Sequence, residues 1–162
     1  MMKRAGLVLA LAAALICGGC SMRGFIDRMV SDKDRALATG VVEALRSGDG
    51  KRLEELFDPE IRESSLSQIP QLPTQFPTTP GKTEIVSFNS SSNYVNGRSS
   101  ESKQFTLVTT DEKLWTTTYL QFASDDGPLR LTSWKVTNAR EKPAELKVLD
   151  MMDTVLPIVA IV

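Results

Sequence analysis

Two cysteines, Cys17 and Cys20, are the residues whose type and spacing carry the most chemistry in this chain of 162 residues. They stand three apart in "LICGGC", and no cysteine follows them. A Cys-x-x-Cys pair takes part in redox exchange when it begins a helix beside a βαβ pattern, and a zinc site needs three or four ligands. Here the pair ends an apolar run, and the chain contains no histidine. We therefore expect neither a redox motif nor a metal site, and no cofactor.

The residues before the cysteines have the pattern of an export signal. The chain begins with the positive group MMKR, and residues 5–16 then carry no charge. A positive start, an apolar run and small residues before the cut are typical of secretory signals. The sequence therefore predicts a signal peptide over residues 1–19. An uncleaved anchor stays open, because the uncharged residues 5–22 are just long enough to span a bilayer.

The stretch "ICGGCS" resembles the lipobox of bacterial lipoproteins, in which small residues precede a cysteine that is acylated and becomes the new N-terminus. Cys20 matches the modified position, and Gly18 and Gly19 match the two small positions. Cys17 departs from the pattern, since leucine is usual there. The resemblance implies membrane attachment through a lipid on Cys20 in the bacterial envelope. Ser21 after the cysteine implies the outer membrane, with the domain facing the periplasm.

The mature chain of residues 20–162 is long enough for one domain with one core. Loss of Lys3 and Arg4 leaves 17 basic and 20 acidic residues, a net charge of −3. The sequence has no basic run, so we expect no nucleic-acid partner. The mature chain has a single cysteine, Cys20, whose thiol the lipid would occupy, so we expect no disulfide and a core held together by packing alone. We expect a lipidated lead or linker at 20–31, an α+β domain at 32–140 and an apolar tail at 141–162.

The first half of the mature chain has helical periodicity. Residues 25–30 show helical spacing, and Leu37, Val41 and Leu45 form the buried stripe of a helix over 33–47. A second helix is expected over 51–57, with further turns within 60–69. Four prolines in "PQLPTQFPTTP" then predict a loop without helix, a crossover to the strands.

The second half alternates between apolar and polar residues and predicts four strands, at about 82–95, 102–110, 114–124 and 129–139. "NG" at 96–97 is a strong hairpin signal, and "DDGP" at 125–128 is a second turn. In the third strand, Trp115 and Tyr119 share one face, while Leu120 and Phe122 share the other. The sequence therefore predicts an α+β fold with N-terminal helices packed on a curved four-stranded antiparallel meander.

The order of elements over about 32–139 is similar to the cystatin-like cone of the nuclear-transport-factor-like and ketosteroid-isomerase superfamily. The features that carry this resemblance are "LEELFDPEIR", the proline crossover and "DDGPLRLTSWKVTNA". The resemblance implies a cone open at one end. Enzymes of the superfamily work inside it with Asp, His or Tyr.

Five aromatic residues are candidates for lining such a pocket: Phe88, Phe105, Trp115, Tyr119 and Trp134. The alternative is that they only fill the core, and Trp134 in particular is expected to be a core residue. We expect a non-catalytic domain that binds a ligand or partner. A small enzyme like ketosteroid isomerase is the first alternative, although the chain has no histidine, and Asp111, Glu112, Asp125 and Asp126 fall in turns. An envelope assembly or interaction module, using the Ser/Thr-rich hairpin at 89–102, is the second.

The C-terminal tail has moderate helical character over 144–153, and residues 155–162 are uncharged and apolar. An exposed apolar end of this size is unusual on a monomer. Three partners remain open for residues 154–162: the protein's own domain, a second copy or another envelope protein, and the membrane that holds the lipid.

Overall fold

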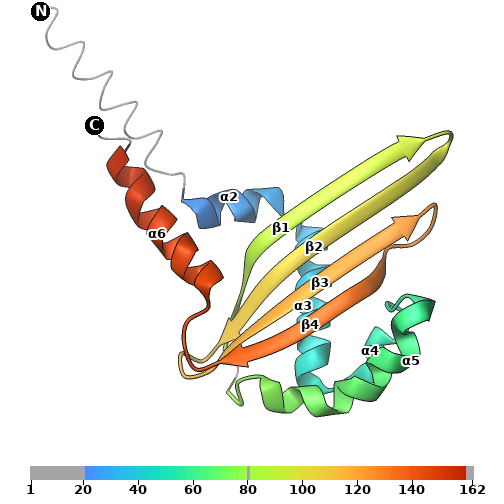
Figure 1. The fold of residues 1–162 in the computed structure, drawn as a ribbon, viewed down its shortest axis with the longest axis horizontal. Coiled ribbons are helices and arrows are strands. Elements are labelled where there is room, and N and C mark those ends of the chain that lie inside the picture. The colour runs from blue at the N-terminus through green and yellow to red at the C-terminus, as the bar shows by residue number, and fades with distance from the viewer. Residues whose placement is uncertain (1–20, 80, 160–162) are drawn as a thin grey trace, which may run out of the picture.

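A four-stranded antiparallel sheet forms the frame of the computed structural model, which describes residues 21–79 and 81–159 and, in the last helix, side chains only up to residue 154. The strands are β1 (Lys82–Val95), β2 (Arg98–Thr110), β3 (Trp115–Asp125) and β4 (Arg130–Ala139), and they lie in the order β1-β2-β3-β4. Helices precede the sheet, and the largest of them packs on one of its faces (Figure 1). The predicted α+β fold, with helices on a curved antiparallel meander, is confirmed.

The β1–β2 hairpin turns at Asn96 and Gly97, which have φ angles of 52° and 82°. Two consecutive residues with positive φ are the mark of a type I′ turn, whose twist matches that of the flanking strands. Pairing therefore begins at once, with Val95 opposite Arg98. For this reason β2 begins four residues earlier than the sequence pattern predicted.

The helices before the sheet are α2 (Met22–Met29), α3 (Asp32–Ser47), α4 (Gly50–Leu53) and α5 (Pro59–Gln68). α3 is the main one and has a cap at each end. The Ser31 side chain accepts from the Asp34 N–H, and Gly48 adopts the left-handed conformation with φ 71°. α4 is one turn long, shorter than the helix expected over 51–57.

The proline-rich stretch holds a short helix that was not predicted. Residues Ile69–Gln75 form the 3₁₀ helix η1, with Pro70 in its first turn and Pro73 inside it. The first turn of a helix needs no hydrogen bond from its N–H groups, so a proline there is tolerated. Ile69 and Leu72 are buried, and their burial holds these turns against the domain.

The core lies between α3 and one face of the sheet, and alternation along β3 shows which residues enter it. Thr116 bonds to the carbonyl of Gln75 in η1, whereas the Tyr119 hydroxyl bonds to Glu145 in the C-terminal helix. The two side chains therefore leave opposite faces of β3, as the alternation predicted. The largest fully buried apolar side chains are Phe57, Phe105, Phe122, Leu45, Leu53, Ile69, Leu107 and Leu131.

Both flanking segments contribute to this core. Ile26 of α2 and Leu146 and Leu149 of α6 (Ala144–Val159) are buried and belong to the same apolar cluster as the α3 residues. Figure 1 shows α6 beside α2, with its last turns extending past the start of α2 and away from the sheet. The expected lead at 20–31 and tail at 141–162 are thus partly built into the domain. Within the described residues, no helix has the length and apolar composition to cross a bilayer.

Candidate functional site: a cleft beside the C-terminal helix

Three of the five predicted pocket aromatics lie on the helix-covered face of the sheet. The ring centroids of Phe88 and Phe105 are 4.9 Å apart, and those of Phe105 and Phe122, whose rings are nearly perpendicular, are 5.9 Å apart. Trp134 is half-buried, and its indole N–H donates to the Ser65 hydroxyl of α5 at 2.9 Å. The two ring contacts join neighbouring strands, and the Trp134 hydrogen bond joins the sheet to α5, so all three aromatic residues take part in packing.

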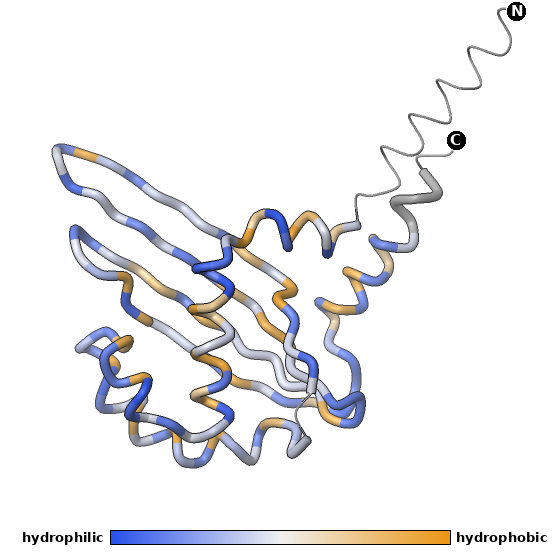
Figure 2. Tube along the Cα trace, turned by 180° about the vertical axis from the view of Figure 1, so that it is seen from behind, coloured by the Kyte–Doolittle hydropathy of each residue, from blue (hydrophilic) through white to orange (hydrophobic). Residues whose placement is uncertain are grey.

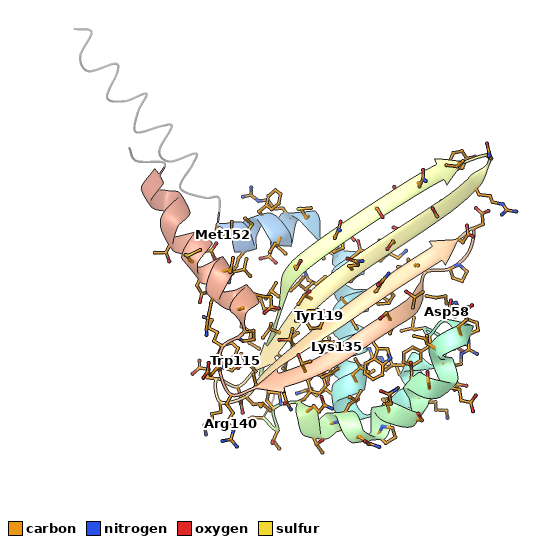
Figure 3. The ribbon with its side chains drawn as sticks, viewed as in Figure 1. Asp58, Trp115, Tyr119, Lys135, Arg140 and Met152 are labelled. Atoms are coloured by element: carbon orange, nitrogen blue, oxygen red, sulfur yellow. The ribbon has the colours of Figure 1, made fainter. Side chains whose placement is uncertain are left out.

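The other two, Trp115 and Tyr119, point to the opposite face. Trp115 lies at the base of β3 close to the start of α6, and Tyr119 lies farther along the same strand (Figure 3). The five aromatics therefore do not line one cavity. The prediction of one shared pocket was wrong because alternate residues of a strand face opposite sides of a sheet, and the five aromatic residues are divided between the two faces.

A cleft of about 560 Å³ opens at the base of the sheet on the side of Trp115. Four segments form it: α2, the start of β1, the β2–β3 turn and the first turns of α6. We call it the α6 cleft. Its walls are Arg23, Thr79, Gly81, Lys82, Glu84, Val108, Thr110, Asp111, Glu112, Lys113, Trp115, Lys142 and Leu146.

An aromatic ring and a fixed cation occupy one wall of the α6 cleft. The Lys142 ammonium lies 5.8 Å from the centroid of the Trp115 ring, within the range of a cation–π contact. Lys142 also forms an ion pair with Asp150 of α6. Hydrogen bonds from Lys142 and then Arg23 hold the pKa of Asp150 below its usual value. Asp150 therefore stays ionised at neutral pH and keeps the Lys142 chain in place.

The rim of the α6 cleft is a tight turn. The Asp111 carboxylate accepts from the N–H groups of Lys113 and Leu114 at 3.1 and 2.9 Å, and Glu112 has a φ of 73°. Those two backbone donors hold the pKa of Asp111 below its usual value. Across from it, a Cβ atom on Gly81 would lie 2.0 Å from the Thr110 carbonyl oxygen. Only glycine allows the chain to pass so close.

Arg23 closes the α2 side of the cleft through an ionic cluster. Its guanidinium bonds Glu84 of β1 at 2.5 Å, Asp150 at 2.5 Å and Asp153 at 2.7 Å. The hydrogen bond to Asp150, with those to Glu84 and Asp153, raises the pKa of Arg23 above its usual value despite partial burial. We call these four residues the Arg23 cluster. It joins α2, β1 and α6.

Sequence reasoning did not find the Arg23 cluster. Arg23 precedes Asp150 by 127 residues and Asp153 by 130 residues, so no local sequence pattern links them. Nor did it single out Lys142, whose role depends on a helix and a strand that meet only in the folded state.

Beyond the cleft, the same face of the sheet is polar. Tyr119 donates to Glu145 at 2.9 Å, and burial together with this bond raises the pKa of Tyr119. Lys135 lies opposite Tyr119 in the β3–β4 register, and Figure 3 shows the two at the middle of the sheet. A shallow hollow of about 250 Å³ lies here, with Gln104, Thr106, Gln121 and Ser133 also among the residues around it.

Comparison with known proteins adds no relative: no family model, curated protein or solved structure matches this chain. Among the described residues, no three His, Cys, Asp or Glu side chains are placed to hold a metal ion. The predicted signal peptide at residues 1–19 and the predicted lipid attachment residue Cys20 lie outside the described residues.

Proposed function

We propose that this protein is a lipid-anchored bacterial envelope protein, attached through Cys20 to the outer membrane, whose periplasmic domain binds a small ligand in the α6 cleft without chemical conversion. The lipobox resemblance of "ICGGCS" supports the attachment. The observation that carries the binding role is the Trp115 ring, which faces an open cleft under the fixed charge of Lys142.

The composition of the α6 cleft defines the kind of ligand. Trp115, Val108 and Leu146 supply an apolar wall, while Lys82, Lys113 and Glu112 supply charges of both signs at the rim. Binding sites of this type combine an apolar surface with a few polar groups that orient the ligand. We therefore propose a small molecule with one flat apolar side and a polar edge.

A catalytic role has less support. Tyr119 and Glu145 form the only tyrosine–carboxylate pair among the described hydrogen bonds, and the pKa of Tyr119 is raised. A tyrosine with a raised pKa keeps its proton at neutral pH and is a poor general base. In the α6 cleft, Glu84 is bound to Arg23, and Asp111 accepts backbone hydrogen bonds. The enzyme alternative, suggested by the resemblance to the ketosteroid-isomerase superfamily, would need another acid or base.

The attachment is tested by metabolic labelling with palmitate. The wild-type chain should incorporate label and sediment with the outer membrane. The Cys20→Ser variant should lose the label and accumulate as a precursor that retains its signal peptide. Equal labelling of both proteins would contradict lipidation at Cys20, and inner-membrane fractionation of a labelled protein would contradict the outer-membrane part alone.

The ligand is tested by native mass spectrometry of the protein released from envelope membranes. The wild-type protein should carry an additional small mass that is absent from Trp115→Ala and weakened in Lys142→Met. Trp134→Phe is the matched control, because Trp134 lies on the opposite face, beneath α5. An additional mass that persists in Trp115→Ala would place the ligand elsewhere, and no additional mass in any variant would argue against a retained ligand.

A second candidate, an interaction module, is favoured by the β1–β2 hairpin. From residue 89 to residue 100 every side chain is exposed, and β1 is an edge strand. Figure 2 shows the outer hairpin as white to blue over most of its length. An exposed strand edge can accept a strand from a partner. Site-specific photo-crosslinking from residue 93 in intact cells should capture one defined partner if this candidate is correct.

A further inference from the structure

The start of α2 and the end of α6 lie together at one corner of the molecule. The Met22 N–H donates to the Asp153 carboxylate at 2.6 Å, and Arg23 bonds the same carboxylate. Only Ser21, the N-cap of α2, stands between Met22 and Cys20. Two residues reach at most about 7 Å, so a lipid on Cys20 would bring a bilayer surface close to this corner.

This corner also carries most of the exposed large apolar side chains in the described part of the chain. On α2, Phe25 and Met29 are 57% and 49% exposed, and on α6, Val148 and Met151 are 48% and 60% exposed. The remaining two, Tyr94 and Val95, lie at the hairpin tip. Each helix thus has a buried face, containing Ile26 or Leu149, and an apolar side turned to solvent.

The sequence of α6 stays apolar beyond Met151. Residues 155–159 are Val-Leu-Pro-Ile-Val, which carry no charged or polar side chain. The helix runs on to Val159, and no charged residue follows Asp153. Because α6 extends past α2 and away from the sheet (Figure 1), this uncharged end leads away from the core.

The charges around the corner suit a lipid surface. Asp150 and Asp153 are bonded to Arg23, and Asp150 also pairs with Lys142, while Lys82 pairs with Glu84, so three cations balance the three carboxylates around Arg23. Arg28 and Lys147, beside the exposed apolar residues of the two helices, are themselves exposed. Basic residues that flank an apolar helix face are typical of helices that lie in the membrane interface.

We propose that Phe25, Met29, Val148, Met151 and the uncharged end of α6 form a membrane-facing surface that enters the interfacial region of the bilayer. This inference rests on the proposed attachment at Cys20. It adds a second contact beside the lipid, fixes the orientation of the domain, and holds the α6 cleft, which shares Arg23 with this corner, close to the membrane.

The test places a single cysteine in the full-length protein, purified from membranes, labelled with an environment-sensitive fluorophore and reconstituted into phosphatidylethanolamine/phosphatidylglycerol vesicles with and without brominated lipid. The tested positions are Phe25→Cys and Met151→Cys. Asn96→Cys, at the hairpin tip, is the matched exposed control. The parent chain gives the background from its own cysteines.

The probes at residues 25 and 151 should shift to shorter emission wavelength, lose intensity with brominated lipid and react at least about tenfold more slowly with an aqueous quencher than the probe at residue 96. Equal access at all three positions would overturn the inference. Protection without quenching by brominated lipid, together with copy-to-copy crosslinks from residue 151, would also overturn it and assign the surface to a second copy.

Palmitate labelling of the same preparation separates the two proposals. A palmitoylated protein whose probes remain in water would contradict only the membrane-facing surface. An unlabelled protein whose probes are quenched by brominated lipid would contradict the attachment at Cys20 and leave the surface supported.

Discussion

Thr116 and Thr118 occupy equivalent positions on the helix-covered face of β3, yet their hydroxyls differ. The Thr116 hydroxyl donates to the Gln75 carbonyl at 2.6 Å, whereas the fully buried Thr118 hydroxyl has no partner among the described residues. A buried polar group without a hydrogen bond destabilises a fold, while one with a good bond contributes to it. These two residues therefore form a natural pair for comparison.

Replacing each threonine with valine, which has nearly the same shape, should change stability in opposite directions. Thr118→Val should raise the free energy of unfolding by about 1 kcal/mol. Thr116→Val should lower it by about 1–2 kcal/mol, because the Gln75 carbonyl loses its short bond from Thr116 and keeps only the long one from Asn138 at 3.5 Å. Urea unfolding of the two variants measures both values. Shifts of equal sign and size would show that the Thr116 bond adds nothing to stability.

Trp134 was expected from the sequence to be a core residue, but it is only half-buried and bonded to Ser65. Trp134→Ala should therefore lower the free energy of unfolding by roughly 2–3 kcal/mol, at or below the lower end of the range for a fully buried tryptophan. Trp134→Phe keeps most of the packing and should lose about 1 kcal/mol for the hydrogen bond. Thermal melts of both variants measure the difference. Equal losses of stability would show that the Trp134 ring adds no packing energy beyond its hydrogen bond.

At the scale of elements, the Arg23 cluster holds α6 against α2 and β1. Arg23→Met should lower the free energy of unfolding by about 1–2 kcal/mol, since Glu84, Asp150 and Asp153 would lose the cation that they share. Amide hydrogen exchange should accelerate over residues 146–153 more than over α3. Arg28→Met is the control, because Arg28 lies on the same helix with an exposed side chain. A similar effect from both variants would indicate a general loss of charge.

A second ionic contact joins α3 to the β1–β2 hairpin and predicts a pH dependence. Lys103 of β2 bonds Asp34 at 2.6 Å, with both side chains largely buried. Burial alone would raise the pKa of Asp34, but bonds from Lys103 and Ser31 outweigh it and lower the pKa. A lowered folded-state pKa adds stability above the unfolded value of about 3.9, and this stability is lost as the pH falls through the folded value.

Lys103→Met should therefore be clearly less stable than wild type at pH 7, and the difference should shrink below about pH 4 as Asp34 becomes protonated in both proteins. Melting temperatures at pH 7 and pH 3 measure the two differences. A gap that stays constant across this range would mean that Asp34 is not the group whose charge Lys103 stabilises.

At the scale of the whole molecule, the sequence was most informative about the sheet. Alternation, together with the Asn96-Gly97 turn, predicted four strands in a meander, because strands that neighbour one another in sequence also pair in space. The 3₁₀ turns of η1 were missed because proline excludes α-helix interiors more strictly than short 3₁₀ turns. Contacts between α2 and α6 were missed because they join residues up to 131 positions apart.

The candidate site shows the same limit. Alternation placed Trp115 and Tyr119 on one face correctly, but chemistry alone grouped them with Phe88, Phe105 and Trp134, which serve the other face. The α6 cleft depends on Gly81, Arg23 and Lys142, whose importance comes from distant neighbours. The roles of such residues can be identified only from the folded structure.

The distance in sequence between α2 and α6 has a consequence for the order of events during biosynthesis. The ribosome makes α2 near the beginning and Asp150 and Asp153 near the end, so a nascent chain can assemble its sheet and α3 while Arg23 still lacks two of its three partners. The joint between α2 and α6 is therefore the last part of the domain to close. Chains released before residue 150 should leave α2 without its α6 contacts and more open to proteases than in the complete domain.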